Sequence, residues 1–494
     1  MYKTSSAQQL TFNDFNQSCG MSLSNDNEWC VLAGRIDWKL AAEMYSKNFP
    51  STKGRPAFPT RLALGALIIQ KRMGLSDRAL VKAIAENPYY QYFIGLPGFQ
   101  AECPFAATSL VGFRKRIGLE LLAAVNESFL KDAPPTPEHA KKKTGEAAGQ
   151  MNQAGTSDAM PVGGSLILDA TCSPSNIRYP HDFSLLNEAR EKTDWMIDVL
   201  HRQVDPDQRH PRTYKQVLRK AYLAMARAKS RPAPKLRSLI RRLLCALKRN
   251  LAFVDSYLER GGKLPARKLA ELATIRTLYA QQKEMFDANR NRVKDRIVSI
   301  SQPFIRPIIR GKARTPVEFG AKYDVSVDEK GHARLEKLSF DAYNECEVLR
   351  DAVERYFKRN GHYPARVLVD RIYRTRANRN FCKEKGIKMS GRGPGHPPAD
   401  GKAERRAERQ NEIDRIEIER FFSRGKRTCG AGLITTRLSE TTLSGIALSV
   451  LVANLFGIPI GDFLALYFFD SPEGTASCHF LEFSDVQDVF AIGA

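Results

Sequence analysis

The sequence predicts an α/β protein, in which a mixed sheet is interrupted by a long helical insertion and preceded by an all-helical N-terminal region. Three observations support this prediction. Residues 58–130 carry apolar side chains at helical spacing. Short apolar runs typical of buried strands lie at 165–173 and 365–373, and a hairpin pattern lies at 317–340. Between the first of these runs and the hairpin, residues 185–300 show long amphipathic helical patterns.

The N-terminal region contains a candidate DNA-binding unit. Ser76 precedes the helical pattern DRALVKAIAE and is a suitable N-cap, while Gly74 provides a turn from the preceding helix. This arrangement fits a helix-turn-helix, but it also fits any two packed helices joined at a glycine. The basic cluster FRKRIG at 113–118 belongs to the same unit. Recognition of DNA by this region is therefore left open.

The next segment, residues 133–163, is predicted to be a flexible linker because it is rich in Pro, Lys, Gly, Ala and Gln and poor in apolar side chains. The run SLILDATCS follows it and predicts a buried strand ending in Asp169. The run ARVLVDRIY predicts a second buried strand, with Asp370 at its C-terminal end. Between these strands, the hairpin turns at DEKG, and the helical pattern NECEVLRDAVERYFKRNG ends at Gly361. A short helix, ANRNFCKEKG, a further strand, IKMSG, and a last helix complete the order.

The charge balance predicts a polyanionic partner. The chain has 77 Lys and Arg against 54 Asp and Glu, a net charge of +23. Residues 201–296 alone hold 25 bases and 8 acids. Charged helices are usually just solvated, but an excess of this size favours contact with a phosphate backbone.

Cysteine usage and hydropathy predict a soluble cytoplasmic protein. The nine cysteines are scattered and form no C-x-x-C pair, which argues against a zinc module and a disulfide framework. The N-terminus, MYKTSSAQQLTFNDF, lacks the apolar core of a signal peptide. The most apolar run, at 443–461, is interrupted by Ser444, Ser449 and Asn454, and this favours a buried core helix over a membrane span.

Three carboxylates form the candidate metal site. Asp169 and Asp370 are each expected at a strand end, where side chains converge at one edge of a sheet, and Glu419 is expected on the last helix. Three such carboxylates can hold two divalent ions, and Mg²⁺ suits a site with few carboxylates. A single aspartate at a strand end is more often a turn cap. The order of all three in a basic chain favours the metal site.

The last helix, which contains the stretch EIERFFSRGKR at 417–427, supports the same interpretation. At 100° per residue, Arg415, Glu419 and Lys426 fall within about 40° of one another, so that two bases flank the acid and are candidate phosphate clamps. The alternative is a solvated face with an ordinary i,i+4 ion pair. Gly425 offers a second objection, since a helix ending there would misplace Lys426.

Other acids compete for a place in the site. Four of them are candidate polar neighbours or ligands: Asp182, Asp324, Asp328 and Glu345. Glu417 lies only two residues before Glu419, but on a regular helix the two side chains point about 160° apart. Glu417 is therefore the weaker candidate.

The segments LILDATCSPSNIRYPHD, VLVDRIYRTRANR and RIEIERFFSRGK resemble the DDE-type transposases of bacterial insertion sequences. In one large group of this family, the third acid lies in a signature of Tyr, two residues, Arg, three residues, Glu, six residues and Lys. Arg415, Glu419 and Lys426 match that spacing, whereas Glu412 stands at the tyrosine position. The resemblance extends over residues 58–456.

This resemblance implies an RNase H-like catalytic domain at 164–456, with its basic helical insertion at about 190–305. The remaining domains would be an N-terminal helical domain at 1–132, the linker at 133–163 and a C-terminal tail at 457–494.

The resemblance also implies a Mg²⁺-dependent nuclease and strand transferase, for which Mn²⁺ is a substitute ion. Asp169, Asp370 and Glu419 would hold two metals. One ion would activate water and later a DNA 3′-hydroxyl, and the other would stabilise the leaving oxygen. Apart from the resemblance, the residues themselves offer candidate DNA contacts, namely Arg415, Lys426, Arg427, Arg310 and Lys312. For Arg310 and Lys312, the alternative is that bases at a strand edge only keep that edge soluble. The partners would be the inverted repeats at the element ends, target DNA and a second copy of the chain in a synaptic complex at the nucleoid.

Other functions compete with this hypothesis. Nucleases that bind metal through a His-x-His pair are disfavoured because the eight histidines are isolated. Serine and tyrosine recombinases would leave the three acids unexplained. A catalytically inactive, transposase-derived DNA-binding protein is the main alternative, and the presence of all three acids and the lysine favours activity over it.

Overall fold

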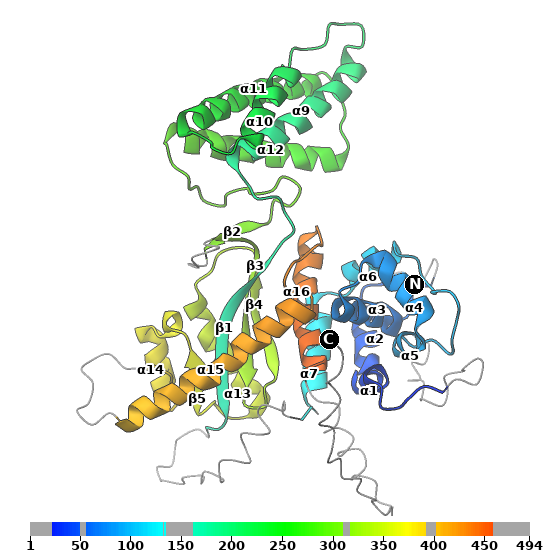
Figure 1. Cartoon of the computed structure of the whole chain (residues 1–494), viewed down its shortest axis with the longest axis vertical. Helices are drawn as coiled ribbons and strands as arrows, with labels where there is room; N and C mark the ends of the chain where they lie inside the picture. Colours follow the sequence, from blue (N-terminus) through cyan, green and yellow to red (C-terminus); the bar gives the residue numbers. More distant parts are fainter. Residues whose placement is uncertain are drawn as a thin grey trace, which may run out of the picture.

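The α/β class with a mixed sheet is confirmed by a computed structural model, in which a helical unit extends beyond the sheet and further helices pack beside it (Figure 1). The described residues are 22–49, 56–131, 133–134, 162–309, 317–391 and 402–457. The predicted linker and C-terminal tail lie almost wholly outside these residues.

The N-terminal region contains helices and no extended strand in its described part, as predicted, and residues 94–108 form an irregular connection. Ser76 caps α4 by accepting a hydrogen bond from the Ala79 N–H at 3.3 Å, and Gly74 ends α3 in the left-handed conformation with φ +64°. The helices described here are α1 (Glu28–Arg35), α2 (Trp38–Ser46), α3 (Thr60–Met73), α4 (Asp77–Glu86), α5 (Pro88–Phe93), α6 (Ser109–Arg116) and α7 (Leu119–Lys131).

The sheet has the strand order β2-β3-β1-β5-β6, with β4 also paired to β3. Strand β1 is antiparallel to β3 and parallel to β5, which is in turn parallel to β6. Strands β3 and β4 form the predicted hairpin. The strands are β1 (Ser165–Pro174), β2 (Arg306–Ile309), β3 (Val317–Asp328), β4 (Ala333–Ser339), β5 (Arg366–Val369) and β6 (Lys388–Met389).

The prediction that the first strand ends at Asp169 is wrong. Strand β1 continues to Pro174 because its antiparallel pairing with β3 runs on to the pair Pro174↔Gly320. Its parallel pairing with β5, however, stops at Leu168↔Val369. Asp169 is therefore the first residue of β1 beyond the part that pairs with β5, although it lies in the middle of the strand.

The helices around the sheet follow the predicted order. Gly361, whose φ is +73°, caps the C-terminus of α13 as predicted. Helix α15 runs past Gly425 without a break, so the prediction of an early helix end there is wrong. An ion pair of 2.8 Å between Arg366 and Asp414 ties α15 to β5. These helices are α13 (Val348–Asn360), α14 (Arg376–Glu384), α15 (Lys402–Thr428) and α16 (Ser439–Leu455), with 3-10 turns η3 (Glu345–Glu347) and η4 (Arg371–Tyr373).

The insertion between β1 and β2 is a helical unit with its own core. Leucines such as Leu243 and Leu247 are fully buried inside it and form a cluster separate from those of the sheet. Figure 1 shows the unit beyond the end of β1, joined to the sheet by two connecting segments. Its helices are α9 (Asp182–Val204), α10 (Lys215–Arg227), α11 (Ala233–Glu259) and α12 (Ala266–Asp287).

The apolar run at the C-terminal end of the described chain is a buried core helix, as predicted. Helix α16 packs against α7, α3 and α6 and against β4. The hydroxyls of Ser444 and Ser449 donate hydrogen bonds to carbonyls one turn earlier, which satisfies them inside the core. No helix among the described residues is long and apolar enough to cross a membrane.

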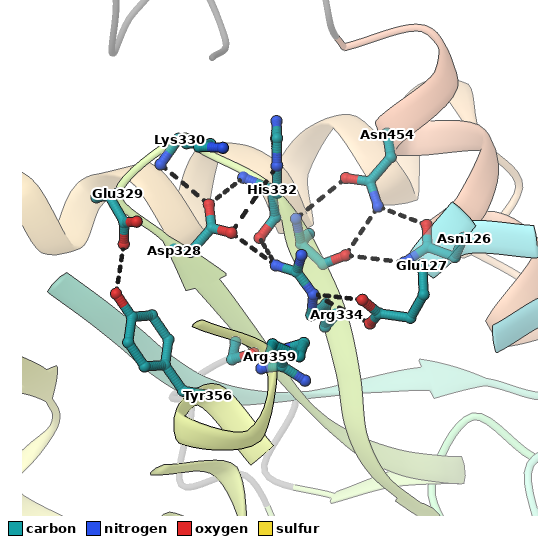
Figure 2. Close-up of polar contacts among 12 residues, drawn as sticks. Asn126, Glu127, Asp328, Glu329, Lys330, His332, Arg334, Tyr356, Arg359 and Asn454 are labelled. Carbon is teal, nitrogen blue, oxygen red and sulfur yellow. Dashed lines mark hydrogen bonds and ion pairs between the residues drawn. The ribbon is translucent and has the colours of Figure 1, made fainter. Parts of the chain in front are cut away.

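A polar network fastens the N-terminal helices to the sheet (Figure 2). The Asn454 amide on α16 donates hydrogen bonds of 2.8 Å to the Asn126 side chain on α7 and to a β4 carbonyl. Arg334 on β4 pairs with Glu127 at 3.0 Å and with Asp328 at 2.7 Å. One hydrophobic core also runs through the N-terminal helices, the sheet and α16. Because this core crosses from the N-terminal helices into the sheet, it does not mark the domain boundaries, which stay predictions.

Candidate active site

The register of two parallel strands brings Asp169 and Asp370 together. The last paired residues of β1 and β5 are Leu168 and Val369, and each aspartate comes immediately after one of them. Neighbouring strands lie about 4.8 Å apart, so the two backbones are adjacent at this position. Asp370 accepts a hydrogen bond from the Arg371 N–H at 2.6 Å as its chain turns out of the sheet into η4.

The surroundings of Asp169 favour its protonated form more than water does. Its side chain is 19% exposed, and burial raises its pKa to about 6. The Ala170 N–H and the Arg415 guanidinium oppose this shift, whereas the negative charges of Asp370 and Glu345 add to it. Asp370 and Glu345 therefore lie within electrostatic reach of Asp169.

Arg415 connects the sheet to the last helix. Its Nη1 lies 3.4 Å from Asp169 Oδ2, and its Nη2 lies 3.2 Å from Glu419 Oε1. The fully buried Ile418 anchors this part of α15, while the Glu419 side chain is 56% exposed. Glu417 pairs instead with Arg420 at 3.7 Å. Asp169 and Glu419, which are far apart in the chain, thus share one guanidinium.

The donor chemistry of this cluster fits a hard divalent cation, because carboxylate oxygens are the ligands that Mg²⁺ takes in proteins. In the arrangement seen, however, no three His, Cys, Asp or Glu side chains among the described residues are close enough together to hold a metal ion. Arg415 lies between Asp169 and Glu419 and offsets their mutual repulsion. For both carboxylates to share an ion, Arg415 would have to move.

A layer of polar groups lies behind the cluster, on β3 and η4. Asp324 is paired with Ala170 across the sheet and is fully buried. Its carboxylate accepts a hydrogen bond from the Tyr373 hydroxyl at 2.6 Å and another from the Tyr343 hydroxyl. Burial raises the pKa of Asp324 to about 6, against the effect of these hydrogen bonds. Asp324 is therefore a fully satisfied neighbour of the site.

Asp324 and Glu345 are among the acids predicted from the sequence as polar neighbours or ligands of the site, whereas Tyr343 and Tyr373 are not among the predicted residues. One signal for a polar layer was available in the sequence. Lys322 and Asp324 alternate along one strand and therefore face the same side of the sheet. Lys322 pairs with Glu345 at 2.7 Å. Asp328, by contrast, belongs to the network of Figure 2, and Asp182 pairs with Arg296 at 2.5 Å in the insertion.

The predicted DNA-contacting bases divide into two sets. Arg415, Lys426 and Arg427 lie on α15, where Arg427 is exposed. Lys426 is seven residues beyond Glu419, which is about 10 Å along a helix axis. Arg310 and Lys312 fall outside the described residues.

Two family models of transposase domains match parts of this chain. A family model described as "Transposase DDE domain" matches residues 367–456, and one described as "Transposase domain (DUF772)" matches residues 18–116. The first match includes Asp370 and Glu419 but not Asp169.

A curated relative is also similar to part of the chain. It is the "Uncharacterized protein ORF8 in nfe locus" of Rhizobium meliloti, 40% identical over 111 residues, which are 22% of this chain and 53% of the relative. The chain thus spans about half the length of that relative. No solved structure matches the chain.

Proposed function

Because two transposase family models match this chain and support a DDE transposase of an insertion element, we propose that it binds the terminal inverted repeats of its element and catalyses metal-dependent cleavage and strand transfer. DDE transposase domains generally use divalent metals, and transposases act on DNA. The finer assignments, to Mg²⁺ and to an RNase H-like domain, are part of this proposal. The strand order with antiparallel β3–β1 and parallel β1–β5–β6 supports the latter.

One observation carries the assignment of the site: Arg415 bridges Asp169 and Glu419, while Asp370 lies beside Asp169 at the next step of the strand register. We assign these three carboxylates as the metal ligands. Bound Mg²⁺ would supply an activated water or 3′-hydroxyl and stabilise the leaving oxygen.

The other residues of the site hold and orient these groups. Asp324, with the hydroxyls of Tyr343 and Tyr373 bonded to it, fixes η4 against β3 and so fixes the backbone that follows Asp370. Arg415 is placed to exchange its carboxylate partners for a phosphate of the DNA strand, because a guanidinium binds carboxylate and phosphate with the same geometry. Lys426 and Arg427 would contact the backbone further along.

The proposal predicts that the purified chain with Mg²⁺ nicks DNA at the ends of its own element. Asp169→Asn, Asp370→Asn and Glu419→Gln should each abolish cutting, because each removes a charged ligand, while binding to the ends persists. Chelation of the metal should give the same result reversibly. Full cutting by Glu419→Gln would overturn the assignment of the site.

A transposase-derived DNA-binding protein without activity is the competing function. It predicts binding to the ends with no cutting under any metal condition. The DNA beside the gene gives an independent test, since terminal inverted repeats flanked by short direct duplications would mark a mobile element. Absence of both would favour the competing function.

A further inference from the structure

The helical insertion concentrates its positive charge in one segment. From Lys215 to Arg249 the sequence has twelve Lys or Arg and no Asp or Glu. This segment comprises α10, the connection after it and most of α11, and the two helices contact each other. We call it the basic hairpin. Helix α9 of the same unit carries five acids and three bases, so charge is segregated inside the insertion.

The acids of α9 do not neutralise the basic hairpin, because most of them already have partners near them on α9. Asp194 pairs with Arg190 at 2.5 Å and Glu188 with Lys192 at 3.7 Å. Asp182 pairs with Arg296 outside the basic hairpin, and Asp198 is the acid of α9 that pairs with a base of the hairpin, Lys215, at 2.6 Å.

Most bases of the hairpin are exposed and make no ion pair or hydrogen bond with other described residues. Arg237 donates to Asn289, Arg231 donates to backbone carbonyls, and Arg249 lies over the Tyr214 ring. The eight others are exposed and form no ion pair or hydrogen bond within the described chain: Arg219, Lys220, Arg227, Lys229, Lys235, Arg241, Arg242 and Lys248.

The helical spacing turns several of these bases outward. On α10, Lys220 and Arg227 lie within about 20° of the direction opposite the buried Leu218. On α11, Arg241 and Lys248 lie within about 20° of the direction opposite the buried Leu239. The two bases of each pair are seven residues apart, which is about 10 Å along the axis, a distance over which a duplex presents several phosphates.

We propose that the basic hairpin is a second DNA-binding surface, which holds the phosphate backbone of a duplex without reading its sequence. That the bound polyanion is DNA rests on the proposed function. Exposed bases without acidic partners are expected to contribute most to the free energy of DNA binding, because each contact with a phosphate releases condensed counterions. The insertion follows β1, the strand that carries Asp169 (Figure 1). DNA bound to the hairpin would therefore be held by the same chain that carries the proposed metal ligands.

The test compares two triple variants of the full chain, in EDTA, on a DNA duplex of arbitrary sequence. The first, Lys220→Gln with Arg241→Gln and Lys248→Gln, removes three unpaired bases of the hairpin. The control, Arg276→Gln with Lys283→Gln and Arg290→Gln, removes three bases that pair with Asp255, Asp287 and Glu284 in the same insertion. Both variants lose the same formal charge.

Binding is measured against salt concentration. The slope of log K against log salt should decrease by about 0.9 for each phosphate that the variant no longer binds, and so by up to about 3 in the hairpin variant, while the control keeps the slope of the parent. Equal slopes in the two variants would overturn the proposal. So would tight binding of duplex RNA without binding of duplex DNA.

Cys245 provides a readout that needs no substitution. It lies on α11 between Arg241 and Lys248 and is the exposed member of the seven cysteines in the described part of the chain. Duplex DNA should slow its alkylation at low salt, and high salt should restore the rate. An unchanged rate would count against the proposal.

These outcomes separate the hairpin from the proposed function. Protection of Cys245 without any cutting of the element ends would leave the hairpin proposal standing and remove the proposed function. Cutting with an unchanged salt slope in the hairpin variant would do the reverse.

Discussion

Two arginines of this chain each have a carboxylate four residues later on the same helix, but in opposite surroundings. In α9 of the insertion, Arg190 and Asp194 are 2.5 Å apart, with side chains 2% and 3% exposed. In α15 at the sheet edge, Arg415 and Glu419 are 3.2 Å apart, with side chains 27% and 56% exposed. The spacing is the same, but the burial differs.

The hydrogen bonds around each pair explain what the difference means. Asp194 also accepts a hydrogen bond from Asn250 at 2.8 Å, and Arg190 donates to Asn187 at 2.9 Å. The buried pair is thus surrounded by protein partners and has a structural role. The edge pair has only long contacts, including 3.4 Å from Arg415 to Asp169, and is open to solvent and to a ligand. An arginine with an acid at i+4 therefore indicates neither role without its surroundings.

The largest effect should come from the buried pair. Asp194→Ala removes the buried countercharge of the Arg190 guanidinium and leaves it only the exposed Glu191 at 3.2 Å, which should lower the free energy of unfolding by about 3 kcal/mol. Chemical denaturation of the full chain, followed by its helical signal, measures this loss. Because the insertion has a separate core, the loss should appear in the transition of the insertion. The matched variant Glu419→Ala should cost about 1 kcal/mol or less, and equal losses would contradict the comparison.

This contrast shows what the sequence could and could not predict. The apolar run ARVLVDRIY was enough to place Asp370 after β5, and spacing alone was enough to place Arg415 and Glu419 on one helix face. The extent of β1 was missed because it depends on pairing with β3, which is distant in the chain. The contact from Arg415 to Asp169 depends on how α15 docks on the sheet, and no local pattern encodes that docking.

A smaller effect is expected from the arginine of the edge pair. Arg415→Gln should slow cleavage about 10–100-fold, as loss of a group that orients metal ligands typically does. Its free energy of unfolding should change by no more than about 1 kcal/mol, because the pair is partly exposed. Single-turnover cleavage measured across Mg²⁺ concentrations tests this role, since a purely structural defect would leave the metal dependence unchanged. Arg420→Gln, five residues further along α15, is the matched control and should cleave like the parent.

The smallest effect should come from the acid next to the pair. Glu417 and Glu419 are two residues apart on α15, yet Glu417 pairs with Arg420 while Glu419 shares Arg415 with Asp169. Glu417→Gln keeps the shape of the side chain and should change cleavage by no more than about two-fold, whereas Glu419→Gln should abolish it. Both variants remove one negative charge from α15, Glu417 from a side chain that is 17% exposed and Glu419 from one that is 56% exposed. The cleavage rates under identical Mg²⁺ then report which of the two helix faces meets the DNA. If Glu417→Gln were inactive instead, the helix face with Arg415 and Glu419 would have only a structural role. The edge pair would then not differ in role from the buried pair of α9.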